Sequence, residues 1–337
     1  MDEQTKSWRI VAVRRLSEAQ LEALSEVAEV DYFEDVDESN RADFMAALSR
    51  AHGLIGGKLE LNEAMLAEAP ALQVVSTISV GYDHLPLKAL NQRRVLLCNT
   101  PDVLTETTAD TAFMLIMATQ RRLVELSNLV RDGGWRTHIG PEYFGIDVHG
   151  KTLGIVGAGR IGAAIARRGA LGFGMPILYT AASSKPALEQ QLGAKRRELN
   201  DLLAEADIVC LSVPYNSDTH HLIDADALAR MKTTAALINI ARGKVVDEPA
   251  LIEALHSGGI RAAGLDVFVE EPLPPDSPLA AMDNVVTTPH IGSATHETRE
   301  AMAQLAVDNL LGTLIGSGPL TAVNEHVWRR ADAIEET

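Results

Sequence analysis

Residues 151–162 (KTLGIVGAGRIG) constrain the fold of this chain more than any other stretch. Residues 152–156 form a short apolar run with β-branched side chains, which is typical of a strand buried on both faces. A G-x-G-x-x-G turn follows at Gly157, Gly159 and Gly162, and then an Ala-rich segment with helical spacing. A strand, this turn and a helix in that order predict a dinucleotide-binding unit, with the pyrophosphate at the N-terminus of the helix. A plain glycine-rich turn is the alternative.

The second strand of such a unit usually ends near an Asp or Glu that holds the ribose 2′-hydroxyl of NAD. Here the predicted strand PILYT (176–180) is followed by AASSK, and no carboxylate appears before Glu189. A carboxylate would repel a 2′-phosphate, whereas Ser hydroxyls and a Lys would bind it. We therefore expect NADP(H) to be preferred and NAD(H) to be accepted, with contacts from Thr180, Ser183 and Lys185. Because this stretch has no Arg to clamp the phosphate, a pocket without a strong preference is the alternative.

The overall composition narrows the class of protein. The 337 residues are enough for about two domains, and the apolar content of 46% is enough for their cores. A net charge of −16 argues against nucleic-acid binding and against anchoring on anionic membranes. Cys98 and Cys210 lie in apolar runs and are expected to be buried free thiols. Because we find no signal peptide and no apolar run of membrane-spanning length, we expect a cytoplasmic protein.

The first hundred residues alternate strand and helix patterns, which predicts a parallel sheet covered on both faces. A capping box at Ser17 opens the first helix, and strands are expected at residues 8–13, 30–33, 54–56, 72–78 and 95–98. The turn after the fourth strand contains Val80 and Gly81, whose backbone N–H groups are suited to a small anion. A connecting turn without a ligand is the alternative.

A long helix and an aromatic loop follow this first domain. Residues 105–131 predict one helix with a capping box at Thr107, ended by a Gly-Gly pair. The next segment has loop-like composition and gathers Trp135, Tyr143 and Phe144 in a chain with 4% aromatic residues. This local concentration of aromatic side chains indicates a protein interface, which we expect to be that of a dimer. A satellite hydrophobic cluster under the loop is the alternative.

The strand patterns after the glycine turn predict a second parallel sheet. Its further strands are expected at residues 207–213, 236–240, 263–267 and 285–288. A long amphipathic helix over residues 295–315 is expected to return to the first domain, which makes that domain discontinuous. We therefore predict an α/β fold with residues 1–101 as the first part of a substrate domain, 102–292 as a dinucleotide-binding Rossmann domain, and 293–337 as the returning C-terminal helix.

Three charged or titratable side chains stand just past predicted strands of the second domain: Arg242, Glu271 and His290. Because ligands of such sheets bind at the carboxyl ends of the strands, all three would face the crevice that holds the cofactor. Taken singly, each of these residues more often has a role other than catalysis: a loop Arg is usually solvated, a Glu before Pro often belongs to a turn, and a lone His is usually structural. Together they form a proton donor, a carboxylate that orients it and a group that binds anions.

This set of side chains is suited to the reduction of a 2-oxo acid. When a hydride attacks the carbonyl carbon, a protonated His290 can deliver a proton to the oxygen, and Glu271 would orient the ring and favour its charged form. Arg242 can pair with the substrate carboxylate through two N–H groups. The backbone N–H groups of Val80 and Gly81 would hold the other carboxylate oxygen.

The stretches that contain these residues resemble those of the D-isomer-specific 2-hydroxyacid dehydrogenases, and the resemblance extends over nearly the whole chain. The matching stretches are SVGYDHL (79–85), NTPDVLTETTAD (99–110), GAGRIG (157–162), INIARGKVVDEPAL (238–251), AAGLDVFVEEPL (262–273) and TPHIGSATHETR (288–299). The resemblance implies that Arg242, Glu271 and His290 are catalytic, and that Val80 and Gly81 bind the substrate together with Arg242 and His290. It also implies two Rossmann-like domains with parallel sheets, a discontinuous flavodoxin-like substrate domain, and a homodimer.

The same resemblance implies a set of cofactor contacts, with Asp266 expected at the nicotinamide amide. These contacts are Thr108, Arg160, Ile161, Pro214, Thr219, Ile240, Ala241, Asp266 and Gly292. Within the family, the stretches WRTHIGPEYFG, GFGMPILY and HIGSATHETR are similar to those of glyoxylate/hydroxypyruvate and 2-ketogluconate reductases, which prefer NADPH. Those enzymes often carry an Arg just after the second strand, where this chain has Ala-Ala-Ser-Ser at 181–184.

The expected activity is therefore NAD(P)H-dependent reduction of glyoxylate, hydroxypyruvate or 2-ketogluconate to the D-2-hydroxy acid. Two alternatives stay open: a dehydrogenase for a larger 2-oxo acid, and a dinucleotide-sensing binding module similar to the transcriptional corepressors that resemble this family. We expect no metal site, because His220 and His221 have no Cys or further His at ligand spacing.

Overall fold

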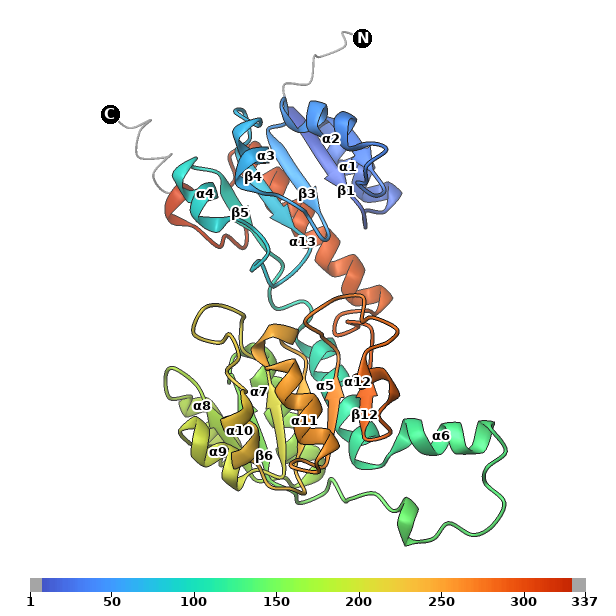
Figure 1. The fold of residues 1–337 in the computed structure, drawn as a ribbon. Coiled ribbons are helices and arrows are strands. Elements are labelled where there is room, and N and C mark those ends of the chain that lie inside the picture. Colours follow the sequence, from blue (N-terminus) through green and yellow to red (C-terminus); the bar gives the residue numbers. More distant parts are fainter. Residues whose placement is uncertain (1–7, 329–337) are drawn as a thin grey trace. The chain divides into compact units, whose positions relative to one another are not determined.

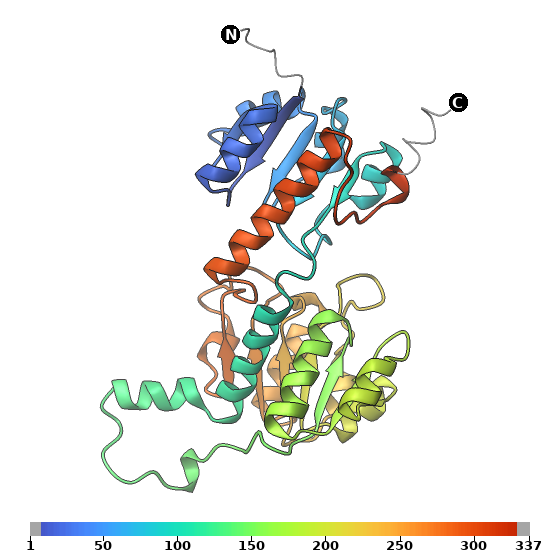
Figure 2. The same ribbon diagram turned by 180° about the vertical axis from the view of Figure 1, so that it is seen from behind.

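The computed structural model describes residues 8–328, which fold into two compact units. In the described part, unit 1 comprises residues 8–104 and 295–328, and unit 2 comprises residues 105–294. The borders expected from the sequence are 101/102 and 292/293. Figures 1 and 2 show that the C-terminal helix lies beside the N-terminal strands, so that unit 1 is built from two separate stretches of the chain.

Unit 1 contains a parallel sheet with the strand order β2-β1-β3-β4-β5. Its strands are β1 (Trp8–Val13), β2 (Ala28–Phe33), β3 (Gly53–Gly56), β4 (Val74–Thr77) and β5 (Leu96–Cys98). This is the flavodoxin-like order. The strands β3 and β4 are buried along their whole length, as is usual where helices cover both faces of a parallel sheet.

Helices cover both faces of this sheet. One face carries α1 (Glu18–Val27) and α13 (His296–Leu314), and the other carries α2 (Arg41–Leu48), α3 (Glu63–Ala67) and α4 (Leu87–Gln92). The predicted capping box is confirmed, because the Gln20 N–H donates to Ser17 Oγ and the Ser17 N–H donates to Gln20 Oε1. The helix α13 begins after the cap Thr295, whose side chain accepts from the Thr298 N–H.

Buried polar contacts fasten the returning segment to unit 1. The side chain of Asn309 on α13 is fully buried, and its Oδ1 accepts from the N–H groups of Leu320 (2.9 Å) and Thr321 (2.8 Å). Asn324 then accepts from the Leu97 N–H of β5 at 2.7 Å. The bonds of Asn309 lie within the returning segment, and the bond of Asn324 ties this segment to β5 of the sheet.

Unit 2 contains a seven-stranded parallel sheet with the order β12-β11-β10-β9-β6-β7-β8. Its strands are β6 (Leu153–Val156), β7 (Ile177–Thr180), β8 (Lys195–Arg196), β9 (Ile208–Leu211), β10 (Ala236–Asn239), β11 (Ala262–Leu265) and β12 (Val285–Thr287). With β6 as the first strand, this is the Rossmann order 3-2-1-4-5-6 with one strand added. The predicted α/β fold class is therefore confirmed.

Two helical layers enclose this second sheet. One layer contains α5 (Thr105–Gln120), α7 (Arg160–Phe173) and α8 (Pro186–Leu192), and the other contains α9 (Leu199–Glu205), α10 (Ala225–Arg230), α11 (Glu248–His256) and α12 (Pro278–Ala281). Both cysteines are free and buried in the sheets, and burial raises the pKa of each thiol to about 12. Among residues 8–328, no helix combines the length and apolarity needed to cross a bilayer.

The predicted helix over residues 105–131 is wrong as a single element. It is broken at Arg122, which adopts a left-handed conformation (φ 52°), between α5 and α6 (Leu123–Arg131). The guanidinium of Arg122 binds both carboxylate oxygens of Glu125 and the carbonyl of Glu142, which follows the break by twenty residues. The predicted capping box is also wrong, because Thr107 lies inside α5 and not before it.

Candidate active site

The glycine turn has the geometry that a dinucleotide needs. Gly157 has φ +100°, which favours glycine, and a Cβ on Gly162 would collide with the carbonyl of Gly157. In contrast, a Cβ on Gly159 would meet nothing within 4 Å, so the turn is open on that side. Gly159 is also the N-cap of the fourteen-residue α7, and no side chain caps this end. An open helix N-terminus of this kind fits the pyrophosphate of NAD(P)(H).

The loop after β7 contains the predicted contacts to the adenosine ribose. Ser183 is exposed in this loop, and the backbone N–H of Lys185 donates to the hydroxyl of Tyr179 at 2.8 Å. One further cation lies here that the sequence analysis missed: Arg196 of β8 donates from Nη2 to the carbonyl of Ala181 at 3.0 Å. A strand of two residues has no recognisable hydrophobic pattern in the sequence. Only the pairing of β7 with β8 shows that Arg196 lies beside this loop.

Two of the three predicted catalytic side chains are in direct contact. His290 Nδ1 lies 2.7 Å from Glu271 Oε2, and the exposed fractions of the two side chains are 47% and 28%. The other carboxylate oxygen of Glu271 accepts from the Phe268 N–H at 3.1 Å. Burial alone would raise the pKa of Glu271, but the contact with His290, the Phe268 N–H and the charge of Arg242 outweigh it and lower that pKa. Glu271 is therefore an ionised partner for the imidazole.

Arg242 belongs to the same cluster. It is the third residue after the end of β10. Its carbonyl accepts from the Asn239 side chain at 3.0 Å, and its Nη1 donates to the Ala241 carbonyl at 2.7 Å. The next residue, Gly243, packs against the backbone of Phe268, where a Cβ would collide with the carbonyl group. This close approach joins the loop of Arg242 to the loop of Glu271. The structure thus brings the predicted triad together at the carboxyl edge of one sheet.

The loop that carries His290 is held by the buried carboxylate of Asp266. One oxygen accepts from the hydroxyl of Thr288 (2.7 Å) and the N–H of Ile291 (2.8 Å), and the other accepts from the N–H of Gly292 (2.8 Å). These bonds flank His290, which has a left-handed backbone (φ 53°). Asp266 thereby fixes the loop that positions the imidazole, a role that no pattern in the sequence indicates. Its expected contact with the nicotinamide amide stays a prediction.

The remaining expected cofactor contacts of unit 2 lie around the same edge of the sheet. Thr108 on α5 lies beside Gly292, and the hydroxyl of Thr219 donates to the carbonyl of Pro214 at 2.8 Å. Arg160 and Ile161 form the first turn of α7, and Ile240 and Ala241 follow β10. Their contacts with a cofactor stay predictions.

The expected substrate contacts Val80 and Gly81 follow β4 in unit 1. The Val80 carbonyl accepts from the Asn99 side chain at 2.9 Å, and the Gly81 carbonyl accepts from the hydroxyl of Ser79 at 2.7 Å. The backbone of this turn is therefore fixed by side chains. Its role toward a substrate stays a prediction.

The adjacent histidines His220 and His221 have stacked rings, with centroids 4.0 Å apart. His220 contacts the hydroxyl of Tyr215 at 3.2 Å, and His221 lies 3.9 Å from the carboxylate of Asp247. Within the part of the chain that the structure describes, no three His, Cys, Asp or Glu side chains gather in a way that could hold a metal ion.

Comparison with known proteins identifies the family. The model of the D-isomer specific 2-hydroxyacid dehydrogenase NAD-binding domain matches residues 113–292. Glyoxylate/hydroxypyruvate reductase B of Escherichia fergusonii is 51% identical over 318 residues, which cover 94% of this chain and 98% of that protein. The corresponding protein of Yersinia enterocolitica is 50% identical over 302 residues, which cover 90% and 93% of the two chains.

Solved structures agree with this assignment. The NADPH-dependent glyoxylate/hydroxypyruvate reductase of Sinorhizobium meliloti, in complex with NADP and malonate, superposes with a TM-score of 0.81 and 34% identity, over 94% of this chain and 97% of that one. The TT0316 protein of Thermus thermophilus reaches 0.86 with 42% identity, over 94% and 99%. The chain therefore belongs to the D-isomer-specific 2-hydroxyacid dehydrogenases, NAD(P)-dependent oxidoreductases that act on 2-oxo acids and D-2-hydroxy acids.

Proposed function

We propose that this enzyme reduces a small 2-oxo acid (glyoxylate, hydroxypyruvate or 2-ketogluconate) to the D-2-hydroxy acid, with NADPH preferred over NADH. The observation that carries the proposal is the 2.7 Å contact between His290 and Glu271, next to Arg242. The relatives named glyoxylate/hydroxypyruvate reductase B support this choice of substrates. The cytoplasmic location stays a prediction from the sequence.

His290 is the proton donor in this mechanism. Because the ionised Glu271 can only accept, Nδ1 carries the proton of this contact, and Nε2 is left as the nitrogen that can serve a reacting group. A protonated Nε2 gives its proton to the carbonyl oxygen of the substrate as negative charge develops there. When bound, a nicotinamide cofactor would supply the hydride for the carbonyl carbon. The ionised Glu271 stabilises the charged imidazole before the transfer and keeps the ring in place.

Arg242 binds and polarises the substrate. A guanidinium presents parallel N–H donors that match the two oxygens of a carboxylate. Pairing with the 2-oxo acid carboxylate would bring the adjacent carbonyl oxygen to His290 Nε2, because both residues belong to one cluster. This requirement explains why the substrate is a 2-oxo acid and not a simple ketone or aldehyde.

The substrate and cofactor choice is tested with the purified enzyme and a panel of 2-oxo acids. We expect loss of NADPH absorbance with glyoxylate, hydroxypyruvate or 2-ketogluconate, and a smaller kcat/KM with NADH. Phenylpyruvate serves as the larger substrate in the same panel. If phenylpyruvate is the best substrate, the enzyme is a dehydrogenase for larger 2-oxo acids. Tight cofactor binding without turnover of any 2-oxo acid would instead favour a dinucleotide-sensing module.

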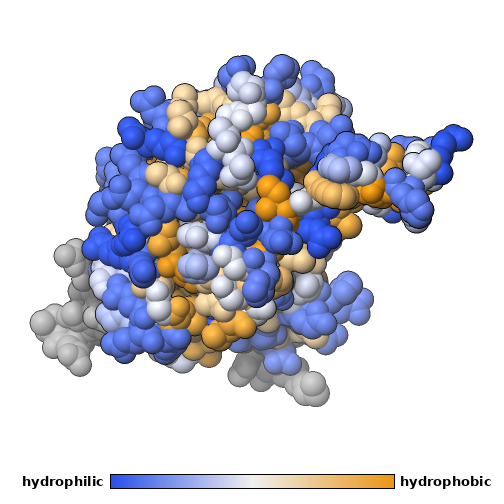
Figure 3. All heavy atoms as spheres, turned by 90° about the horizontal axis from the view of Figure 1, so that it is seen from below, coloured by the Kyte–Doolittle hydropathy of each residue, from blue (hydrophilic) through white to orange (hydrophobic). Residues whose placement is uncertain are grey.

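We also propose that the enzyme is a homodimer, joined through an arm formed by residues 121–147. This arm projects from the rest of unit 2 (Figure 1), and its helix α6 buries none of its residues. The space-filling view shows apolar side chains on the projecting part (Figure 3). Trp135 and Phe144 are 60% and 62% exposed, which contradicts the alternative of a satellite cluster under the loop.

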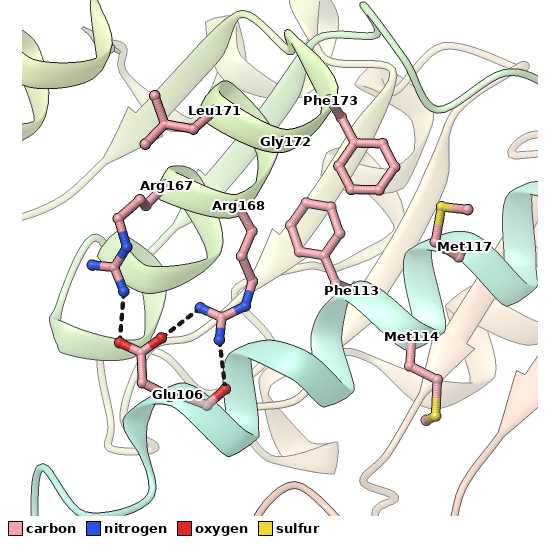
Figure 4. Close-up of a pocket in the computed structure, with 9 residues that line it drawn as sticks. All are labelled: Glu106, Phe113, Met114, Met117, Arg167, Arg168, Leu171, Gly172 and Phe173. Carbon is pink, nitrogen blue, oxygen red and sulfur yellow. Dashed lines mark hydrogen bonds and ion pairs between the residues drawn. The ribbon is translucent and has the colours of Figure 1, made fainter.

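A second apolar surface of unit 2 supports the same proposal. The close-up of the hollow between α5 and α7 shows the stacked rings of Phe113 and Phe173, 5.2 Å apart, beside Met114 and Met117 (Figure 4). At one end, Glu106 bridges two arginines of α7 through ion pairs of 2.6 and 2.8 Å. An apolar centre with a charged border is typical of a protein interface, and identical copies pair most often through a two-fold axis.

Light scattering tests the oligomeric state. We expect the mass of a dimer for the native enzyme and the mass of a monomer for the double variant Trp135→Asp, Phe144→Asp, because burying two new carboxylates disfavours association. The matched control is Leu320→Asp, at a side chain that is 66% exposed in unit 1. A native enzyme that runs as a monomer at micromolar concentration would refute the proposal.

A further inference from the structure

We propose that Arg196 binds the 2′-phosphate of NADP(H) and is the main residue that sets the preference for NADP(H) over NAD(H). This inference deepens the proposed function and rests on its cofactor. The sequence predicts only hydroxyls and Lys185 at this position, because AASSK contains no Arg. The structure supplies the missing guanidinium from the neighbouring strand.

The position of Arg196 follows from the pairing of β7 with β8. In the parallel register, Arg196 lies opposite Tyr179, one residue before the end of β7. Its side chain reaches past the end of β7, because Nη2 donates to the carbonyl of Ala181, the first residue of the loop (3.0 Å). In a Rossmann fold, the residue that contacts the ribose 2′ position stands at this end of the second strand. The exposed guanidinium therefore lies where an NAD-specific enzyme carries a carboxylate.

The bond to Ala181 fixes this guanidinium but uses only one of its five N–H donors. The planar group can still offer a phosphate two parallel donors, the geometry that distinguishes Arg from Lys. Ser183 is exposed in the same loop and can add a hydroxyl donor. A phosphate at this position would thus contact a cation already held against the loop.

The first carboxylate after β7 in the sequence does not oppose this role. Glu189 Oε1 accepts from the hydroxyl of Tyr179 at 2.5 Å and from the hydroxyl of Ser184 at 3.4 Å. Tyr179 is fully buried, so its hydroxyl holds this carboxylate toward the body of unit 2. Glu189 Oε1 is therefore engaged by two hydroxyl donors of unit 2, and the carboxylate organises the base of the loop.

The two neighbouring cations of the same segment differ from Arg196. Arg197 donates from Nε to Glu205 at 2.8 Å, which commits its guanidinium to α9. Lys195 is the other residue of β8, and its side chain points to the opposite face of the sheet because side chains alternate along a strand. Lys195 is therefore a matched control: it has the same charge and the same strand, but lies on the other side.

The experiment measures binding without turnover. Isothermal titration of the native enzyme with 2′,5′-ADP and with 5′-AMP gives the contribution of the 2′-phosphate. We expect Arg196→Ala to weaken 2′,5′-ADP binding at least about tenfold and to leave 5′-AMP binding unchanged, because bonds to charged groups are the strong ones. Arg196→Lys should lie between, and Lys195→Ala should match the native enzyme.

The outcomes separate this inference from the proposed function. Unchanged 2′,5′-ADP affinity in Arg196→Ala overturns the role of Arg196. Equal affinity of the native enzyme for 2′,5′-ADP and 5′-AMP overturns it as well. Both results count against Arg196 even if the enzyme reduces glyoxylate. If Arg196→Ala loses 2′,5′-ADP selectively while no 2-oxo acid is reduced, the proposed function fails and the role of Arg196 stands. Equal unfolding temperatures of the variants exclude a loss of fold as the cause.

Discussion

Replacing His290 by Ala should lower kcat for glyoxylate reduction by about 100- to 10,000-fold, the contribution typical of a positioned general acid. The substitution removes the proton donor and leaves the glycine turn and Arg242 in place. The carbonyl oxygen must then take its proton from water while the hydride arrives. Steady-state kinetics with NADPH, together with NADPH binding followed by fluorescence, measures both parts of this expectation.

The control for this variant is His256→Ala, at an exposed histidine near the end of α11 in the same unit. That enzyme should keep native kcat and KM. NADPH affinity should be unchanged in both variants, because neither imidazole is expected at the cofactor phosphates. A His290→Ala enzyme with native turnover would show that another group supplies the proton.

Replacing Arg242 by Ala should lower kcat/KM by about 1,000-fold, equivalent to ~4 kcal/mol, because two charge-assisted hydrogen bonds to the substrate carboxylate would be lost. The loss should appear in KM as well as in kcat, since the guanidinium both binds the carboxylate and orients the carbonyl. Arg242→Lys should recover a part of it, because a lysine supplies the charge without the paired donors. Saturation curves over a wide range of glyoxylate concentration resolve the two parameters.

Arg230→Ala controls for the removal of one positive charge, since Arg230 is exposed at the end of α10. Its kinetics should be native. If Arg242→Ala kept a native KM for glyoxylate, the substrate carboxylate would be bound elsewhere, and the role assigned to this guanidinium would be wrong.

Much of the fold could be predicted from the sequence because buried parallel strands leave strong local patterns. The strand at residues 153–156, the glycine turn and the capping box of α1 at Ser17 all depend on residues close to one another in the sequence. The break at Arg122 could not be predicted, because it depends on the carbonyl of Glu142, twenty residues away. For the same reason the strand β8, two residues long, is visible only through its pairing with β7.

In the candidate site, too, features that depend on nearby residues could be predicted from the sequence, whereas features that depend on residues far away in the chain could not. The position of Arg242, Glu271 and His290 just past strands predicted a shared edge of the sheet, and the structure brings them together there. The sequence could not reveal that Asp266 holds the loop on both sides of His290, since those bonds span 22 to 26 residues. Nor could it reveal that Arg196 reaches back to the loop after β7.

The central claim is that Glu271 acts through His290 as one proton-donating unit. A double-mutant cycle of pre-steady-state NADPH oxidation tests it most directly, with His290→Ala, Glu271→Gln and the combined variant. Because Glu271 contributes only through the imidazole it holds, the combined variant should be about as slow as His290→Ala alone. If the two losses multiply in the combined variant, the carboxylate and the imidazole act independently, and the account is contradicted.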